Sequence, residues 1–128
     1  MKRIAVVEDN PDNRLLVTAL LEDRYEIIEY ENGQEALKGM RADPPDLVLM
    51  DISLPEMDGR QVLVAMKQQE ALATIPVIAL TAHAMAGDRE ELLAAGFDDY
   101  VMKPITDEQE LIEAIRRHDH SSTSADGD

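Results

Sequence analysis

The feature that most constrains the fold is a set of five short apolar runs, which recur along the chain at regular intervals. Four of them are continuous rather than alternating, and this pattern is typical of strands that are buried on both faces of a parallel sheet. The second run contains two glutamates and is more polar, so we expect it at an edge of the sheet. The runs are Ile4–Val7, Tyr25–Tyr30, Leu47–Met50, Val77–Leu80 and Tyr100–Met102.

Helical patterns with start and stop signals separate these runs. Asn10-Pro11 offers an N-cap and a first-turn proline, and Gly96 is a natural stop for a helix that starts near Asp88. Further helix starts are predicted at 32–35 and 58–61, which have capping-box spacing, and at 106–109. The apolar pattern of the first helix is Leu15, Leu16, Ala19 and Leu20.

Strands that alternate with helices predict βαβ units with right-handed crossovers, and therefore a doubly wound α/β fold with five parallel strands and five helices. The length of 128 residues corresponds to one domain. Residues 118–128 have almost no apolar side chains, so we expect a disordered tail after a folded domain at 1–117. No second domain, and so no output domain, is expected after residue 117.

Composition excludes several classes of protein. The chain has 27 acidic and 12 basic residues and a net charge of −15, which disfavours nucleic-acid binding and suits hard cations. The absence of cysteine excludes disulfides, thiolate metal sites and a cysteine nucleophile. No signal peptide and no stretch that could enter a membrane is recognisable, so a cytoplasmic location is expected.

Polar residues follow four of the five apolar runs directly. Glu8 and Asp9 follow the first, Asp51 the third, Thr81 the fourth and Lys103 the fifth. The carboxyl ends of parallel strands meet at one edge of the sheet, where ligands of doubly wound folds bind. The sequence therefore predicts three carboxylates, a hydroxyl and an ammonium group in one crevice.

This combination of groups suits phosphoryl chemistry. Three neighbouring carboxylates repel one another, and a magnesium ion with oxygen ligands removes the conflict. Thr81 and Lys103 supply donors for phosphoryl oxygens. Asp51 is the candidate nucleophile, because the third run is apolar enough to be a central strand. Singly, each residue has a plain structural explanation, such as a helix N-terminus, a turn or a solvated charge. Their joint placement at four strand ends favours a functional site.

At this point the chain resembles the receiver domain of two-component response regulators, over about residues 2 to 117. The resemblance implies a flavodoxin-like sheet with strand order 2-1-3-4-5. The segments that carry it are Val6–Asn10, Asp46–Gly59, Pro76–Ala82 and Gly96–Ile105.

The resemblance also implies a role for each site residue. Asp51 is the expected phosphoacceptor. Glu8 and Asp9 are expected to hold Mg²⁺ directly or through water, and Asp51 and the backbone carbonyl of Ser53 complete the expected ligands. Mn²⁺ can substitute for Mg²⁺. Lys103 is expected to pair with the phosphoryl group.

Further expectations concern the switch. Thr81 is implied as the hydroxyl that moves to the phosphoryl group, and Tyr100 as the aromatic side chain that turns inward. The Lys103-Pro104 peptide bond is implied to be cis. Ser53 and His83 occupy the positions that tune the lifetime of the phosphoryl group. His83 either hydrogen-bonds near the attacking water or covers the site.

The function implied is a phosphorylation-controlled switch rather than a metabolic enzyme. A histidine kinase or histidine phosphotransfer protein donates the phosphoryl group, and the output is docking to a downstream protein by a monomer or weak dimer. The expected docking face is the last helix, with Leu111, Ile115, Arg116 and the nearby Tyr100. Two alternatives remain open: an aspartyl-nucleophile phosphatase, although Ser53 stands where a second carboxylate is usual, and a purely structural binding module.

Overall fold

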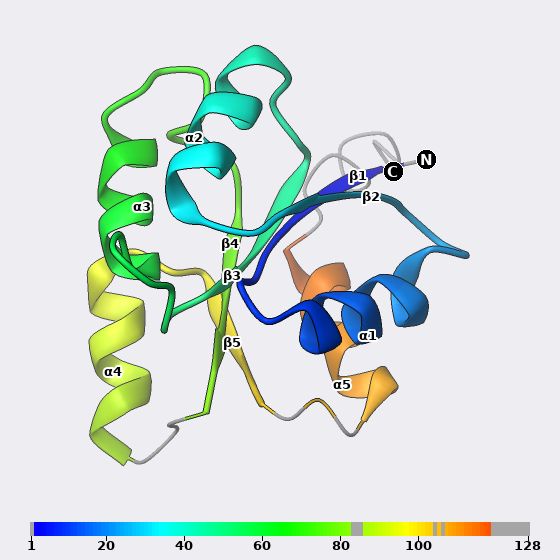
Figure 1. Cartoon of the computed structure of the whole chain (residues 1–128). Helices are drawn as coiled ribbons and strands as arrows, with labels where there is room; N and C mark the ends of the chain where they lie inside the picture. Colours follow the sequence, from blue (N-terminus) through cyan, green and yellow to red (C-terminus); the bar gives the residue numbers. More distant parts are fainter. Residues whose placement is uncertain (1, 83–85, 104, 106, 119–128) are drawn as a thin grey trace, which may run out of the picture.

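The core of the protein is a five-stranded parallel sheet in the order β2-β1-β3-β4-β5 (Figure 1), as the resemblance implies. The computed structural model describes residues 2–82, 86–103, 105 and 107–118. The second strand is at an edge and is only partly buried, as its polar sequence predicts. The strands are β1 Arg3–Val7, β2 Glu26–Tyr30, β3 Leu47–Asp51, β4 Val77–Thr81 and β5 Asp99–Met102.

Helices cover both faces of the sheet (Figure 1). Along β1 and β3, alternate residues point to opposite layers: Val7 and Met50 pack in one apolar cluster, Val6 and Leu49 in the other. These strands are therefore buried on both faces, which is why their sequences are continuously apolar. One layer contains α1 Pro11–Leu21 and α5 Glu108–Arg117, and the other contains α2 Gly33–Ala42, α3 Gly59–Lys67 and α4 Ala86–Ala95.

Side-chain caps start the helices close to the predicted positions. The Asn10 side chain accepts hydrogen bonds from the backbone N–H groups of the next turn of α1, and Asp58 forms a reciprocal capping box with Gln61 at α3. At α5 the cap is Asp107, whose carboxylate accepts from the Gln109 N–H at 2.9 Å. The preceding Thr106 lies outside the described residues.

The apolar pattern located α1 but did not identify its buried face. Val17 and Leu21 are buried at 1% and 0% exposure, whereas Leu15 is 68% exposed and Leu16 is 38% exposed. Leucines stand on several sides of this helix, so helical periodicity alone does not select one face. The contact with the sheet makes the selection, because Val17 and Leu21 pack against the layer that also contains α5.

The prediction of a docking face on α5 is wrong for two of its residues, Leu111 and Ile115. Leu111 and Ile115 are 0% and 1% exposed and belong to the core between α5 and the sheet. The apolar positions of an amphipathic helix face the sheet first, so only its polar side, with Arg116, remains exposed. Tyr100 is half-buried and packs against the apolar cluster in the opposite layer.

Among the helices of the described part of the chain, none is long and apolar enough to cross a membrane. The tail from residue 119 onward lies outside the described residues, so the predicted limit at residue 117 and the disorder beyond it stay predictions.

Candidate functional site

The strand ends bring the predicted polar residues together. Within the described part of the chain, the buried polar residues are Glu8, Asp51 and Thr81, at 1%, 3% and 5% exposure. Glu8 directly follows β1, while Asp51 and Thr81 end β3 and β4. Carboxylate oxygens of Glu8, the exposed Asp9 and Asp51 lie within 4.8 Å of one another. The predicted convergence of three carboxylates is therefore present.

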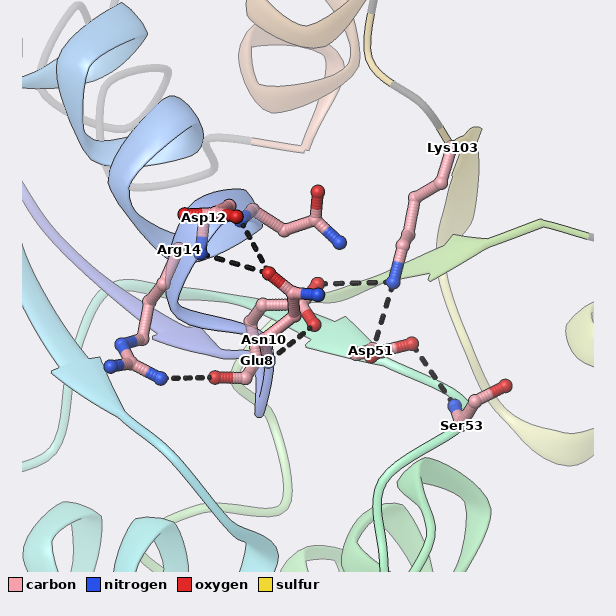
Figure 2. Close-up of polar contacts among 8 residues, drawn as sticks. Glu8, Asn10, Asp12, Arg14, Asp51, Ser53 and Lys103 are labelled. Carbon is pink, nitrogen blue, oxygen red and sulfur yellow. Dashed lines mark hydrogen bonds and ion pairs between the residues drawn. The ribbon is translucent and has the colours of Figure 1, made fainter.

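Lys103 joins two of these carboxylates from the end of β5. Its Nζ lies 3.1 Å from Oε1 of Glu8 and 3.1 Å from Oδ2 of Asp51 (Figure 2). Its backbone N–H donates to the carbonyl of Thr81 at 2.7 Å, which ties this residue to β4. Burial by itself lowers the pKa of Lys103, but the hydrogen bonds and charges of the two carboxylates outweigh it and raise the pKa. The ammonium group is thus charged at neutral pH.

The single positive charge of Lys103 does not balance three carboxylates, and the pKa of Glu8 is raised. Burial, together with the hydrogen bond to and the charge of Asp51, raises the pKa of Glu8 to about 7. The N–H of Asn10, 3.2 Å from Oε2 of Glu8, and Lys103 act in the opposite direction. A hard divalent cation would supply the charge that is missing, and carboxylate oxygens are its preferred ligands. The residues present therefore fit a metal site.

The Asp51 carboxylate is held at both oxygens. Oδ2 contacts Lys103, and Oδ1 accepts a hydrogen bond from the Ser53 N–H at 3.0 Å (Figure 2). The start of α3 lies directly behind it: a Cβ added to Gly59 would come within 2.5 Å of the carbonyl oxygen of Asp51. Glycine at this position permits the close approach. The side chain is therefore preorganised at the bottom of the site.

Open space adjoins the end of β4. A depression of about 370 Å³ lies between the loop after β3 and the helix α4. It is lined by Ile52, Ser53, Arg60, Thr81, Asp88 and Leu92. Thr81 and Ser53, two of the predicted site residues, therefore border a space large enough for a phosphoryl group.

Sequence reasoning missed the basic residue that holds the loop after β1. Nη1 of Arg14 donates to the carbonyl oxygen of Glu8 at 2.9 Å (Figure 2). The only available signal is the spacing of Arg14 and Thr18, which places both on one side of α1. That spacing does not indicate what they face.

Three predicted residues are not part of this constellation as described. His83 and Pro104 lie outside the described residues, so the lifetime role of the first and the cis peptide bond of the second stay predictions. Tyr100, on β5, packs half-buried against the apolar cluster that contains Val77 and Phe97. Its role in switching also stays a prediction.

Comparison with known proteins agrees with this site. The sequence pattern of the response regulator receiver domain matches residues 4–116. The chain is 46% identical over 106 residues to the polar-differentiation response regulator DivK of Brucella anthropi, covering 82% of this chain and 86% of that protein. It is 45% identical over 111 residues to the sensor histidine kinase GacS of Pseudomonas protegens, covering 84% of this chain. The chain spans only 12% of the length of that kinase.

A solved structure extends the similarity to three dimensions. The receiver domain of the sensor histidine kinase PA1611 from Pseudomonas aeruginosa, with a magnesium ion coordinated in its active site cleft, is 36% identical. The alignment covers 91% of this chain and 96% of that one, with a TM-score of 0.83. Sheet order, strand-end carboxylates and family pattern lead to one conclusion: the chain belongs to the response regulator receiver domain family of two-component systems.

Proposed function

We propose that this receiver is a phosphorylation-controlled switch in which Asp51 accepts a phosphoryl group from a phosphohistidine of a partner protein. The observation that carries the proposal is the position of Lys103, whose Nζ is 3.1 Å from both Asp51 and Glu8 at the rim of a carboxylate cluster. Receiver domains are regulatory rather than metabolic proteins. The donor is a histidine kinase or a histidine phosphotransfer protein.

In the transfer, a carboxylate oxygen of Asp51 attacks phosphorus while the bond between phosphorus and the imidazole nitrogen breaks. The imidazole leaves with the bonding electron pair, and an acyl phosphate forms on Asp51. The Ser53 N–H and Lys103 orient the carboxylate beforehand, at 3.0 and 3.1 Å. Lys103 and Thr81 then donate to the phosphoryl oxygens. Positioning and charge neutralisation are what this reaction chiefly needs.

The carboxylates of Glu8, Asp9 and Asp51, with the backbone carbonyl of Ser53, would hold Mg²⁺ or Mn²⁺. The ion would supply positive charge to offset the charge of the transferred group. The clustering of the three side chains within 4.8 Å supports this ligand set, as does the magnesium ion in the related PA1611 receiver.

The acyl phosphate adds charge and acceptor oxygens beside Thr81, and this biases the conformation of β4 and β5. Thr81 and Tyr100 carry the change to the surface, while Ser53 and His83 set its lifetime. The switch acts in the cytoplasm through docking of the 1–117 domain, as a monomer or weak dimer, to a downstream protein.

Labelling with acetyl phosphate in the presence of Mg²⁺ tests the assignment of Asp51. We expect the Asp51→Ala variant to lose the label, because among the described residues no other carboxylate is held by both Lys103 and the Ser53 N–H. Asp23→Ala, at an exposed position after α1, is the matched control and should be labelled like the unsubstituted protein. Label that survives in Asp51→Ala refutes the assignment. Phosphotransfer profiling against histidine kinases then identifies the donor.

A further inference from the structure

A basic side chain lies behind the carboxylate cluster rather than in it. Arg14 donates from Nη1 to the carbonyl oxygen of Glu8 at 2.9 Å, and its Nε lies 3.2 Å from Oε1 of Glu29 on β2. The second oxygen of Glu29 accepts from the Thr18 hydroxyl at 2.8 Å. Arg14 is thus held by α1 and β2 while it holds the residue that follows β1.

The sheet itself explains why the carbonyl of Glu8 needs a donor. The N–H of Glu8 still donates to the carbonyl of Tyr30 at 3.0 Å, which extends the β1–β2 ladder by one residue. In a continued parallel ladder, the carbonyl of Glu8 would accept from the N–H of Asn32. Asn32 instead becomes the N-cap of α2, so β2 has already ended. The guanidinium of Arg14 supplies the hydrogen bond that a longer β2 would have donated to this carbonyl.

The held peptide is the one that carries two of the clustered carboxylates. Its carbonyl belongs to Glu8 and its nitrogen to Asp9, so rotation of this peptide group would move Asp9 relative to Glu8. Arg14 holds the carbonyl oxygen of Glu8, and the Tyr30 carbonyl holds its N–H. Together these two hydrogen bonds oppose that rotation. The guanidinium is also anchored by Glu29, so its own position is restrained.

We propose that Arg14 is a positioning residue of the cation site, which fixes the Glu8-Asp9 peptide so that both carboxylates point at one ion. This inference rests on the proposed function for the presence of the ion. It makes a prediction opposite in sign to simple electrostatics. Removal of a positive charge near a cation site should tighten cation binding by Coulomb's law, whereas loss of the positioning contact should weaken it.

Mg²⁺ titration of Arg14→Gln, followed by NMR, separates the two effects. We expect its dissociation constant for Mg²⁺ to rise about tenfold, the lower end of what loss of a contact behind a metal ligand costs. Arg14→Lys should recover part of the loss, because an ammonium group can still donate to the carbonyl. Arg24→Gln changes the net charge equally at an exposed position and should leave the affinity unchanged.

Amide hydrogen exchange in metal-free protein is the second readout. Exchange at Asn10, whose N–H donates to Oε2 of Glu8 at 3.2 Å, should accelerate in Arg14→Gln and not in Arg24→Gln, while the core strands keep their protection. Glu29→Gln removes the negative charge that anchors Arg14, and it should show both effects more weakly. Because Glu29 acts through Arg14, the variant that combines Arg14→Gln with Glu29→Gln should lose no more affinity for Mg²⁺ than Arg14→Gln alone. If Arg14→Gln fails to fold, Glu29→Gln and Arg14→Lys carry the test.

A folded Arg14→Gln that binds Mg²⁺ as tightly as the unsubstituted protein, or more tightly, overturns the proposal. Unchanged exchange at Asn10 overturns it as well. Failure of the proposed function has a different signature, because then the unsubstituted protein itself binds no Mg²⁺ and accepts no phosphoryl group.

Discussion

Protons and the cation compete for Glu8, so Mg²⁺ affinity should depend on pH near neutrality. The side chain is 1% exposed, and its burial beside Asp51 raises the pKa from 4.5 to about 7. A protonated Glu8 cannot act as an anionic ligand, so the ion must displace the proton. Lowering the pH from 8 to 6 therefore protonates most of the Glu8 side chains.

The magnitude follows from that pKa. About nine-tenths of the Glu8 side chains are ionised at pH 8 and about one-tenth at pH 6. The apparent dissociation constant for Mg²⁺ should therefore be about tenfold higher at pH 6 than at pH 8. At pH 7, binding should release about half a proton per ion, because half of the side chains are protonated beforehand.

Isothermal titration calorimetry measures both quantities. The affinity comes from Mg²⁺ titrations at the two pH values, and the proton release comes from titrations at pH 7 in two buffers with different ionisation enthalpies. Glu8→Gln should bind more weakly and lose the pH dependence. Glu113→Gln, at an exposed position on α5, should retain it. A dissociation constant that changes less than about twofold between pH 6 and 8 would refute the reasoning.

The same pKa makes a statement about folding. Because the pKa of Glu8 is raised in the folded state, from 4.5 to about 7, the folded protein binds the proton more tightly than the unfolded chain. Below pH 4.5 Glu8 is protonated in both the folded and the unfolded state, so through this group the free energy of unfolding does not vary with pH. As the pH rises from 4.5 to 7 the free energy of unfolding falls, and above pH 7 the loss relative to low pH reaches about 3 kcal/mol. Mg²⁺ should relieve much of this cost, so its stabilising effect is expected to be larger at pH 8 than at pH 6.

Four further substitutions test other parts of the structure. Gly59→Ala places a Cβ 2.5 Å from the Asp51 carbonyl oxygen, so thermal unfolding should show a loss of about 1–3 kcal/mol and labelling by acetyl phosphate should slow. Lys103→Gln removes the ammonium group shared by two carboxylates, and the labelling rate should fall on the order of a hundredfold while Mg²⁺ binds more tightly. Leu49→Ala, at 0% exposure, should lower the free energy of unfolding in urea by about 3 kcal/mol. Leu15→Ala, at 68% exposure, should change it by less than about 0.5 kcal/mol.

The site was predictable as far as its residues stand at strand ends. A continuous apolar run followed by an acid needs no knowledge of distant contacts, and parallel pairing brings such ends to one edge. Asp51, Glu8 and Lys103 could therefore be placed together, although Glu8 and Lys103 are 95 residues apart. Which oxygen meets which donor depends on side-chain geometry, so the shared position of Lys103 was not predictable.

Helix faces were the least predictable part of the fold. The apolar residues of α1 surround the helix, and only packing against the sheet shows that Val17 and Leu21 are inside and Leu15 is outside. On α5, Leu111 was expected on the docking face, but it packs in the core between the helix and the sheet. Periodicity reports that a helix has an apolar side, but the partner that covers this side is a tertiary property.

The sequence by itself determined the strands, the helix caps, the doubly wound arrangement and the carboxylates of the site, because these follow from local patterns and from the topology that such patterns permit. Only the tertiary structure decided the protonation of Glu8 and the contact of Arg14 with the peptide behind it. The physical reason is the same in both cases. Burial, charge and hydrogen-bond partners are set by groups that are distant along the chain, and their effect depends on distances of a few ångströms.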